Sequence, residues 1–130
     1  MRGGCRCGAV RFEANGEPQE VIYCHCRDCR RSNGAPISLF CGYRREQLTW
    51  RGDPKTHESS PGVYRSFCGV CGSPISYEDE RIPDMVYLHA GVFDEPERLE
   101  PREHNWISQR LPWFDIRDRL PRHQQSSIPR

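Results

Sequence analysis

Short runs in which hydrophobic and polar residues alternate recur along the chain, and a period of two is typical of β-strands with one buried face. Such runs occupy residues 10–14, 21–23, 37–41, 48–50, 63–67 and 75–77. Residues 85–88 are hydrophobic without interruption, which favours a strand buried on both faces. Eleven glycines and eleven prolines separate the runs, as expected for strands joined by turns. The pattern therefore predicts a mainly β protein.

Signals for helices are few. Residues 26–31 could form one helical turn that ends at Asn33-Gly34, and residues 94–99 could form another short turn. A chain of 130 residues is long enough for one domain, which we expect over residues 1–120. Residues 121–130 are predominantly polar and predict a C-terminal tail.

The cellular environment decides how the eight cysteines are interpreted. The chain has no apolar run of about 18 residues, so no membrane span is expected. The segment Met1–Cys5 lacks the apolar region of a signal peptide, and a cytoplasmic location follows as the expectation. Thiols stay reduced or bind metal there, whereas a secreted chain would form disulfides. A net charge of +1 argues against broad nucleic-acid binding, so no nucleic acid is expected as a partner.

Seven of the cysteines form three clusters with spacings typical of zinc ligands: Cys5 and Cys7; Cys24, Cys26 and Cys29; Cys68 and Cys71. Zinc prefers four ligands in a tetrahedron, and thiolates suit it well. The first and last clusters together supply four ligands, enough to close a structural site. The middle cluster supplies three, which leaves a fourth position for water or substrate. We therefore expect two zinc ions per chain, with the open site oxidisable and in part empty.

Spacing alone does not decide which clusters share an ion. A redox-active dithiol at Cys68 and Cys71 is a weaker alternative, because the surrounding βαβ pattern of thioredoxin-like proteins is missing. The eighth cysteine, Cys41, lies on the same strand face as Ile37 and Leu39, which favours a buried thiol. If Cys41 instead reached the middle cluster, the second site would be closed and purely structural.

An ordered set of motifs resembles the glutathione-dependent formaldehyde-activating enzyme family, which also contains centromere protein V. The resemblance extends from Gly4 to about His123. It rests on the three cysteine clusters and their neighbours, on residues 59–62 (Ser-Ser-Pro-Gly), on Arg65 and Phe67 ahead of Cys68, on Leu99, Pro101 and His104, and on Trp113, Asp118, Leu120 and Pro121.

The resemblance implies a β-tent fold, in which antiparallel sheets are clasped by zinc, similar to a Rab-binding chaperone. It also implies the reversible addition of glutathione to formaldehyde, a carbon–sulfur lyase reaction. Cys24, Cys26 and Cys29 would hold the reactive zinc, and the glutathione thiolate would take the fourth position. The expected partners are thus a small thiol and a small aldehyde. The alternative is a non-catalytic, zinc-stabilised module that binds another protein, which a second site closed by Cys41 would favour.

Polar residues near the middle cluster are further candidates. The side chain of His25 is expected to point away from the ion that its neighbours bind, and His104 is expected to be a structural histidine. Three arginines, Arg27, Arg30 and Arg31, flank the open site and are candidates to bind carboxylates or to offset thiolate charge. Asp28 is expected to pair with one of them. Trp50, Trp106 and Trp113 are expected to pack in the core or at its rim.

Overall fold

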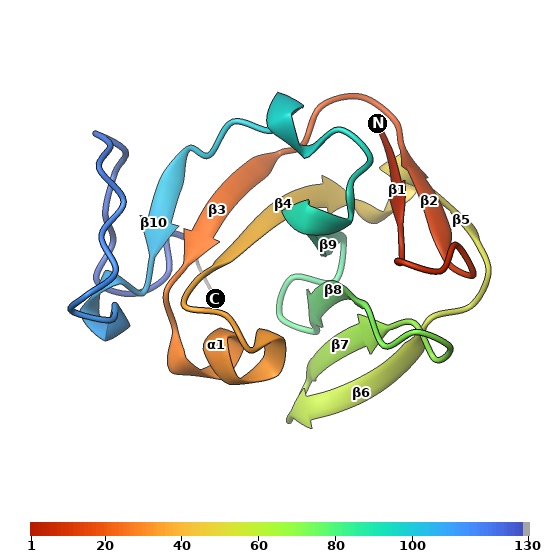
Figure 1. Cartoon of the computed structure of the whole chain (residues 1–130), viewed down its shortest axis with the longest axis horizontal. Coiled ribbons are helices and arrows are strands. Elements are labelled where there is room, and N and C mark those ends of the chain that lie inside the picture. Colours follow the sequence, from red (N-terminus) through yellow and green to blue (C-terminus); the bar gives the residue numbers. More distant parts are fainter. Residues whose placement is uncertain (129–130) are drawn as a thin grey trace.

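The computed structural model describes residues 1–128, whose strands form two sheets. The smaller sheet has the order β1-β2-β5 and consists of β1 (Arg2–Gly4), β2 (Arg11–Ala14) and β5 (Leu48–Arg51). The larger sheet has the order β10-β3-β4-β9-β8-β7-β6. Its strands are β3 (Glu20–Cys24), β4 (Ser38–Arg44), β6 (Lys55–Ser60), β7 (Val63–Phe67), β8 (Pro74–Asp79), β9 (Met85–His89) and β10 (Glu103–Asn105). The predicted mainly β fold is confirmed (Figure 1).

Helices make up only a small part of the described residues. The α-helix α1 (Arg27–Asn33) connects β3 to β4 and matches the helical turn predicted from the sequence. Four single 3₁₀ turns follow: η1 (Arg45–Gln47), η2 (Ala90–Val92), η3 (Pro96–Arg98) and η4 (Ile107–Gln109). None of the helices in residues 1–128 is long and apolar enough to cross a membrane.

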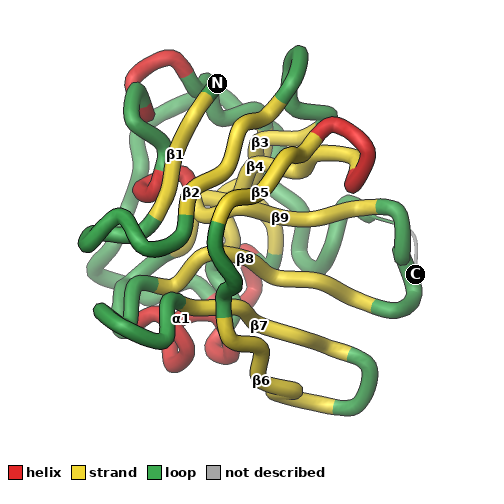
Figure 2. The backbone as a smooth tube through the Cα atoms, turned by 90° about the vertical axis from the view of Figure 1, so that its right-hand side faces the viewer, coloured by secondary structure: helices red, strands yellow, loops and turns green. Residues whose placement is uncertain are grey.

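The two faces of the larger sheet pack in different hydrophobic clusters, as a period of two requires. In β3, Val21 contributes to the main core, whereas its neighbour Ile22 contributes to the second cluster. In β4, Cys41 belongs to the main core and Phe40 to the second cluster. The strands β9, β8, β7 and β6 follow one below another in Figure 2. The second face of this sheet is the one that carries Cys24 and the candidate site described below.

The smaller sheet is joined to the main core through aromatic packing. The ring of Phe12 contacts the ring of Phe93 edge-on, with 5.1 Å between centroids, and lies 5.6 Å from the ring of Trp50. Gly3 pairs with Phe93 across an isolated bridge, and a Cβ atom at Gly3 would lie 2.4 Å from the carbonyl oxygen of Val92. The backbone can approach so closely only because glycine lacks a Cβ. This contact holds β1 against the end of η2.

One pairing in the larger sheet differs from the antiparallel arrangement that the family resemblance implied. β10 runs parallel to β3, with His104 opposite Tyr23, while the other pairs in both sheets are antiparallel within the described residues. Residues 121–128 then lie against β10, because the backbone N–H of His104 donates to Pro121 and that of His123 donates to His104. These hydrogen bonds join backbone groups, which every residue carries, so the side-chain pattern of the sequence did not predict them.

Candidate functional site

Seven thiols gather in two groups, within each of which the sulfur atoms lie within 4.8 Å of one another. The first group contains Cys5, Cys7, Cys68 and Cys71, and the second contains Cys24, Cys26 and Cys29. No disulfide joins any pair of the eight cysteines, all of which are described. The partition into four and three that ligand counting suggested is therefore the partition found in space.

The four-thiol group joins two distant turns. Cys5 and Cys7 follow β1, and Cys68 and Cys71 lie in the turn between β7 and β8. Backbone N–H groups surround the sulfurs: Val10 donates to Cys5 at 3.2 Å, and Cys71 donates to Cys68 at 3.5 Å. The backbone N–H of Arg6 also donates to the Ser73 hydroxyl at 3.0 Å, so the two turns are linked outside the sulfurs. The N–H groups of Val10 and Cys71 stabilise negative charge on the sulfurs to which they donate.

The spacing of these sulfurs fits a tetrahedral zinc ion. A Zn–S bond of about 2.3 Å gives tetrahedral edges of about 3.8 Å between sulfurs. The distance is 3.6 Å between the sulfurs of Cys5 and Cys7, and 3.8 Å between those of Cys7 and Cys68. A hydrogen bond from the Ser73 hydroxyl is the largest cause that lowers the pKa of Cys71, to about 5. The donor set and its spacing fit a metal ion such as zinc held by four thiolates.

The three-thiol group lies where β3 passes into α1. Cys24 is the last residue of β3, Cys26 is the N-cap of α1, and Cys29 lies in the first turn of the helix. The backbone N–H of Cys29 donates to the Cys26 sulfur at 3.3 Å, as N-cap geometry requires. The helix ends at Gly34, whose φ of 65° is the left-handed conformation that glycine adopts readily. The cap at Cys26 thus brings the third thiol next to the other two.

Negative charge in the three-thiol group is concentrated on Cys26. Hydrogen bonds from the thiols of Cys24 and then Cys29 lower the pKa of Cys26 far below its ordinary value, although burial opposes the shift. Cys24 keeps its proton because it donates to the Cys26 sulfur, at 3.4 Å, and its pKa is raised accordingly. The sulfur distance is near the edge of a tetrahedral site. The group fits a zinc ion with three protein ligands.

An arginine from another strand reaches the same group. Nη2 of Arg65, in β7, lies 3.6 Å from the Cys29 sulfur and donates to the Asp28 carboxylate at 3.0 Å. The guanidinium also lies over the ring of Tyr77, 5.1 Å from its centroid. The arginine side chain is 11% exposed, so its charge acts in surroundings that solvent screens weakly. The pair of Arg65 and Asp28 therefore fixes the start of α1 against β7.

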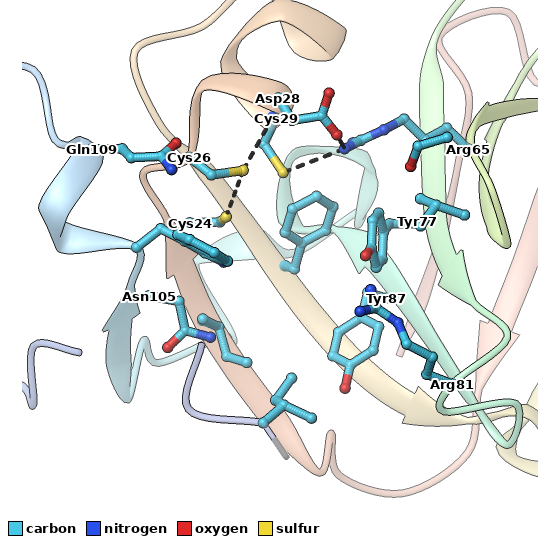
Figure 3. A pocket seen from close by; sticks show the side chains of 16 residues that line it. Cys24, Cys26, Asp28, Cys29, Arg65, Tyr77, Arg81, Tyr87, Asn105 and Gln109 are labelled. Carbon is cyan, nitrogen blue, oxygen red and sulfur yellow. Dashed lines mark hydrogen bonds and ion pairs between the residues drawn. The ribbon is translucent and has the colours of Figure 1, made fainter. Parts of the chain in front are cut away.

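A cavity of about 260 Å³ adjoins the three thiols. Hydrophobic and aromatic residues form much of its wall: Ile22, Phe40, Val63, Tyr77, Tyr87 and Trp106. In Figure 3 the three cysteines lie on one side of the cavity, with Tyr77, Tyr87 and Arg81 on the other. We call this cavity the thiol chamber. A ligand that occupies it lies directly against the three-thiol group.

Comparisons with known proteins place the chain in a family. A family model described as "Glutathione-dependent formaldehyde-activating enzyme" matches residues 1–109. The chain belongs to this family. A Halomonas elongata protein named, provisionally, as a glutathione-dependent formaldehyde-activating enzyme is 28% identical, and the match covers 92% of this chain and 82% of that protein. A crystal structure of a Rhodobacter sphaeroides protein shares the fold, with a TM-score of 0.60 at 22% identity over 72% of this chain and 88% of its own.

Two histidines of this formaldehyde-activating enzyme family member lie behind the thiols and do not line the chamber. Nε2 of His25 lies 2.9 Å from Nδ1 of His104, and Nε2 of His104 lies 2.9 Å from the Asp118 carboxylate. Burial is the main cause that lowers the pKa of His25 to about 4, so this ring is neutral at pH 7. The chain of contacts attaches β3 to the segment after β10. The side chain of His25 points to His104, away from the thiols on either side of it in sequence.

The arginines next to the cysteines lie elsewhere than expected. Arg27, Arg30 and Arg31 line a separate open cavity with the exposed Trp113, and none of the three lines the thiol chamber. The expectation that Asp28 pairs with one of them is wrong, because Asp28 pairs with Arg65. Relative to Asp28, Arg27 and Arg30 lie at i−1 and i+2, where side chains on a helix do not face each other. Arg31, at i+3, lies on the same side, but Arg65 of β7 reaches the Asp28 carboxylate instead.

Cys41 lies apart from both thiol groups. Its side chain is fully buried in the main core. Phe40 and the chamber lie on the other face of the larger sheet. Burial raises its pKa to about 12, so the thiol stays protonated. A second site closed by Cys41 is therefore not formed among the described residues.

The chamber residues Arg65, Tyr77, Arg81 and Tyr87 were not singled out as site residues from the sequence. A signal existed only for Arg65, which alternates with Val63 and Phe67 and so shares a strand face with two hydrophobic residues. An arginine on a hydrophobic strand face is unusual unless it has a partner. Tyr77 and Tyr87 come from the neighbouring strands β8 and β9, and Arg81 comes from the turn between these strands, so the three become recognisable only after the sheet is assembled.

Proposed function

We propose that this protein is a zinc-dependent carbon–sulfur lyase that catalyses the reversible addition of glutathione to formaldehyde, giving S-hydroxymethylglutathione. The observation that carries the proposal is a group of three thiols, not four, at the wall of a ligand-sized chamber. A fourth protein ligand is the usual feature of a structural zinc site, and its replacement by an open position is the feature of a reactive one. Membership of the formaldehyde-activating enzyme family supports the choice of substrates.

Each thiol group has a different part in the proposal. Cys5, Cys7, Cys68 and Cys71 would hold a closed zinc that joins the two sheets. Cys24, Cys26 and Cys29 would hold the second zinc. A zinc ion bound there supplies Lewis acidity, which lowers the pKa of a coordinating thiol and polarises a carbonyl group. Free thiols persist in reducing compartments, so a cytoplasmic location is part of the same proposal.

The residues of the chain orient the reacting groups and limit access of water. In the addition, a C–S bond forms, the π electrons of the carbonyl move to its oxygen, and the proton lost by the thiol ends on that oxygen. Arg65 donates to the Cys29 sulfur, while Asp28 holds the guanidinium in place. The backbone N–H of Cys29 fixes the Cys26 sulfur. The aromatic walls reduce the amount of water around a carbonyl bound beside the thiols, which strengthens electrostatic interactions with charge that develops on the carbonyl oxygen.

Zinc-edge X-ray absorption with and without glutathione tests the proposal. The protein alone is expected to show an average of about three and a half sulfurs per zinc, the mean of a four-thiol and a three-thiol site, and reduced glutathione is expected to raise this mean to four. S-methylglutathione is the matched control, because it has the same peptide but no free thiol. An unchanged sulfur shell with reduced glutathione would refute thiol binding at the open zinc. Formation of S-hydroxymethylglutathione above the uncatalysed rate is the second required result.

A further inference from the structure

The thiol chamber is larger than its proposed aldehyde requires. Formaldehyde has two heavy atoms, whereas the chamber volume of about 260 Å³ approaches the lower end of the roughly 300–1,000 Å³ typical of small-molecule pockets. The space adjoins the thiols, so a substrate carbonyl beside them would point its substituent into it. A hydrogen substituent would leave this space to water.

The walls of this space suit an apolar group. The rings of Phe40 and Tyr77 lie 6.0 Å apart, and those of Tyr77 and Tyr87 lie 6.2 Å apart, edge to face. Ile22 and Val63, both buried, complete the wall on β3 and β7. A ring or branched alkyl group between these side chains would lose contact with water and gain aromatic contacts.

Each arginine of the chamber already has a carboxylate partner. Of the described lining residues, two are arginines: Arg65 pairs with Asp28 at 3.0 Å, and Arg81 pairs with Asp79 at 2.6 Å. Within the described residues, Nη1 of Arg65 is buried without a hydrogen-bond partner, so the chamber could pair with one carboxylate of glutathione. The second carboxylate would stay unpaired, which is strongly unfavourable in an apolar site. The peptide of glutathione is therefore better placed at the exposed rim, near Gln109 and Ser60, than among the aromatic rings.

We infer that the thiol chamber binds the substituent of an aldehyde larger than formaldehyde, with an aryl or medium-length alkyl group. The inference rests on the proposed function and names its substrate class. The thiol adds to R–CHO to give a hemithioacetal: the C–S bond forms, the carbonyl π bond opens, and the thiol proton is transferred to the oxygen. Ile22, Phe40 and Tyr87 are then residues that determine specificity for R.

A series of aldehydes tests the inference with the zinc-loaded protein and glutathione. The rate enhancement is kcat/KM divided by the uncatalysed rate constant for the same aldehyde, because formaldehyde is intrinsically more electrophilic. From acetaldehyde to butanal we expect the enhancement to rise about fourfold per methylene, the equivalent of roughly 0.8 kcal/mol for each buried CH₂. Benzaldehyde is expected to match or exceed butanal. An enhancement that stays flat or falls along the series, with formaldehyde still turned over, overturns the inference and leaves the proposed function intact.

Binding of benzyl alcohol gives a readout that needs no turnover. We expect its titration to shift side-chain NMR signals of Ile22, Phe40 and Tyr87, and not the methyl signals of Val21, whose side chain lies on the opposite face of β3. The variant Ile22→Phe places a ring in the chamber and is expected to weaken benzyl alcohol binding at least tenfold. Its control is Val21→Ile, which adds bulk to the other face.

The two sets of measurements separate the failures. Benzyl alcohol that binds without shifting chamber residues overturns the inference. Binding in the chamber, combined with no thiol ligation and no addition to any aldehyde, supports an apolar ligand for the chamber and refutes the lyase function alone. If Ile22→Phe does not fold, the wild-type aldehyde series and the wild-type titration still decide the question.

Discussion

Replacing Cys7 with serine isolates the contribution of the four-thiol cluster to stability, because the Cys7 side chain is exposed and packs in neither hydrophobic cluster. Exposed substitutions away from special features usually change stability by less than about 0.5 kcal/mol. Serine is a poor zinc ligand, so Cys7→Ser removes one of the four ligands and little else. A larger loss of stability would therefore report the cross-link.

The structure sets the size of the expected loss. Cys7 and Cys68 are 61 residues apart in sequence. A cross-link that closes a loop of this length lowers the entropy of the unfolded chain by an amount worth about 4 kcal/mol at 25 °C. The remaining three thiols can still bind zinc, more weakly, so we expect Cys7→Ser to lower the free energy of unfolding by about 2–4 kcal/mol.

Urea denaturation at a fixed concentration of free zinc measures this loss, and elemental analysis measures zinc per chain. We expect the zinc content to fall from two towards one. Ala9→Ser is the matched control, since Ala9 is an exposed residue of the same loop without a thiol. If Cys7→Ser keeps two zinc ions and unfolds within 0.5 kcal/mol of Ala9→Ser, the cluster is not a metal cross-link.

Three further substitutions follow from the same structure. Cys41→Ser buries a hydroxyl in the main core, so it should lower the free energy of unfolding, measured in urea, by about 1–3 kcal/mol. The zinc content should not change, and a loss of zinc would contradict the placement of Cys41. Gly3→Ala places a Cβ 2.4 Å from the Val92 carbonyl oxygen and should lower the free energy of unfolding by about 1–3 kcal/mol. Gly91→Ala is its control and should leave stability nearly unchanged, because the space around its Cβ is open; equal effects of the two substitutions would refute the close approach. Arg65→Gln removes the donor to the Cys29 sulfur and should weaken zinc binding at the three-thiol site by about 10–100-fold in chelator competition, and an unchanged affinity would count against this role.

Local sequence patterns were sufficient to predict much of the secondary structure. Each alternating run overlaps a strand, and the hydrophobic run at residues 85–88 falls within β9. Three strands had no such signal. β1 contains two glycines, β6 is almost entirely exposed, and β10 is only three residues long. Period-two hydrophobicity reports a buried face, so a strand that buries little or is very short escapes it.

Ligand number was the part of the site that the sequence determined by itself. Zinc chemistry requires four ligands in a closed site, so counting ligands over the three cysteine clusters predicted a division into four and three, although the spacings alone left the pairing of the clusters open. The chamber is different, because β3, β4, β7, β8 and β9 each contribute a side chain to its wall. Only the register between strands decides that Ile22 lies opposite Phe40 and that Arg65 lies opposite Tyr77. Such pairings are contacts between distant segments, which tertiary structure alone brings together.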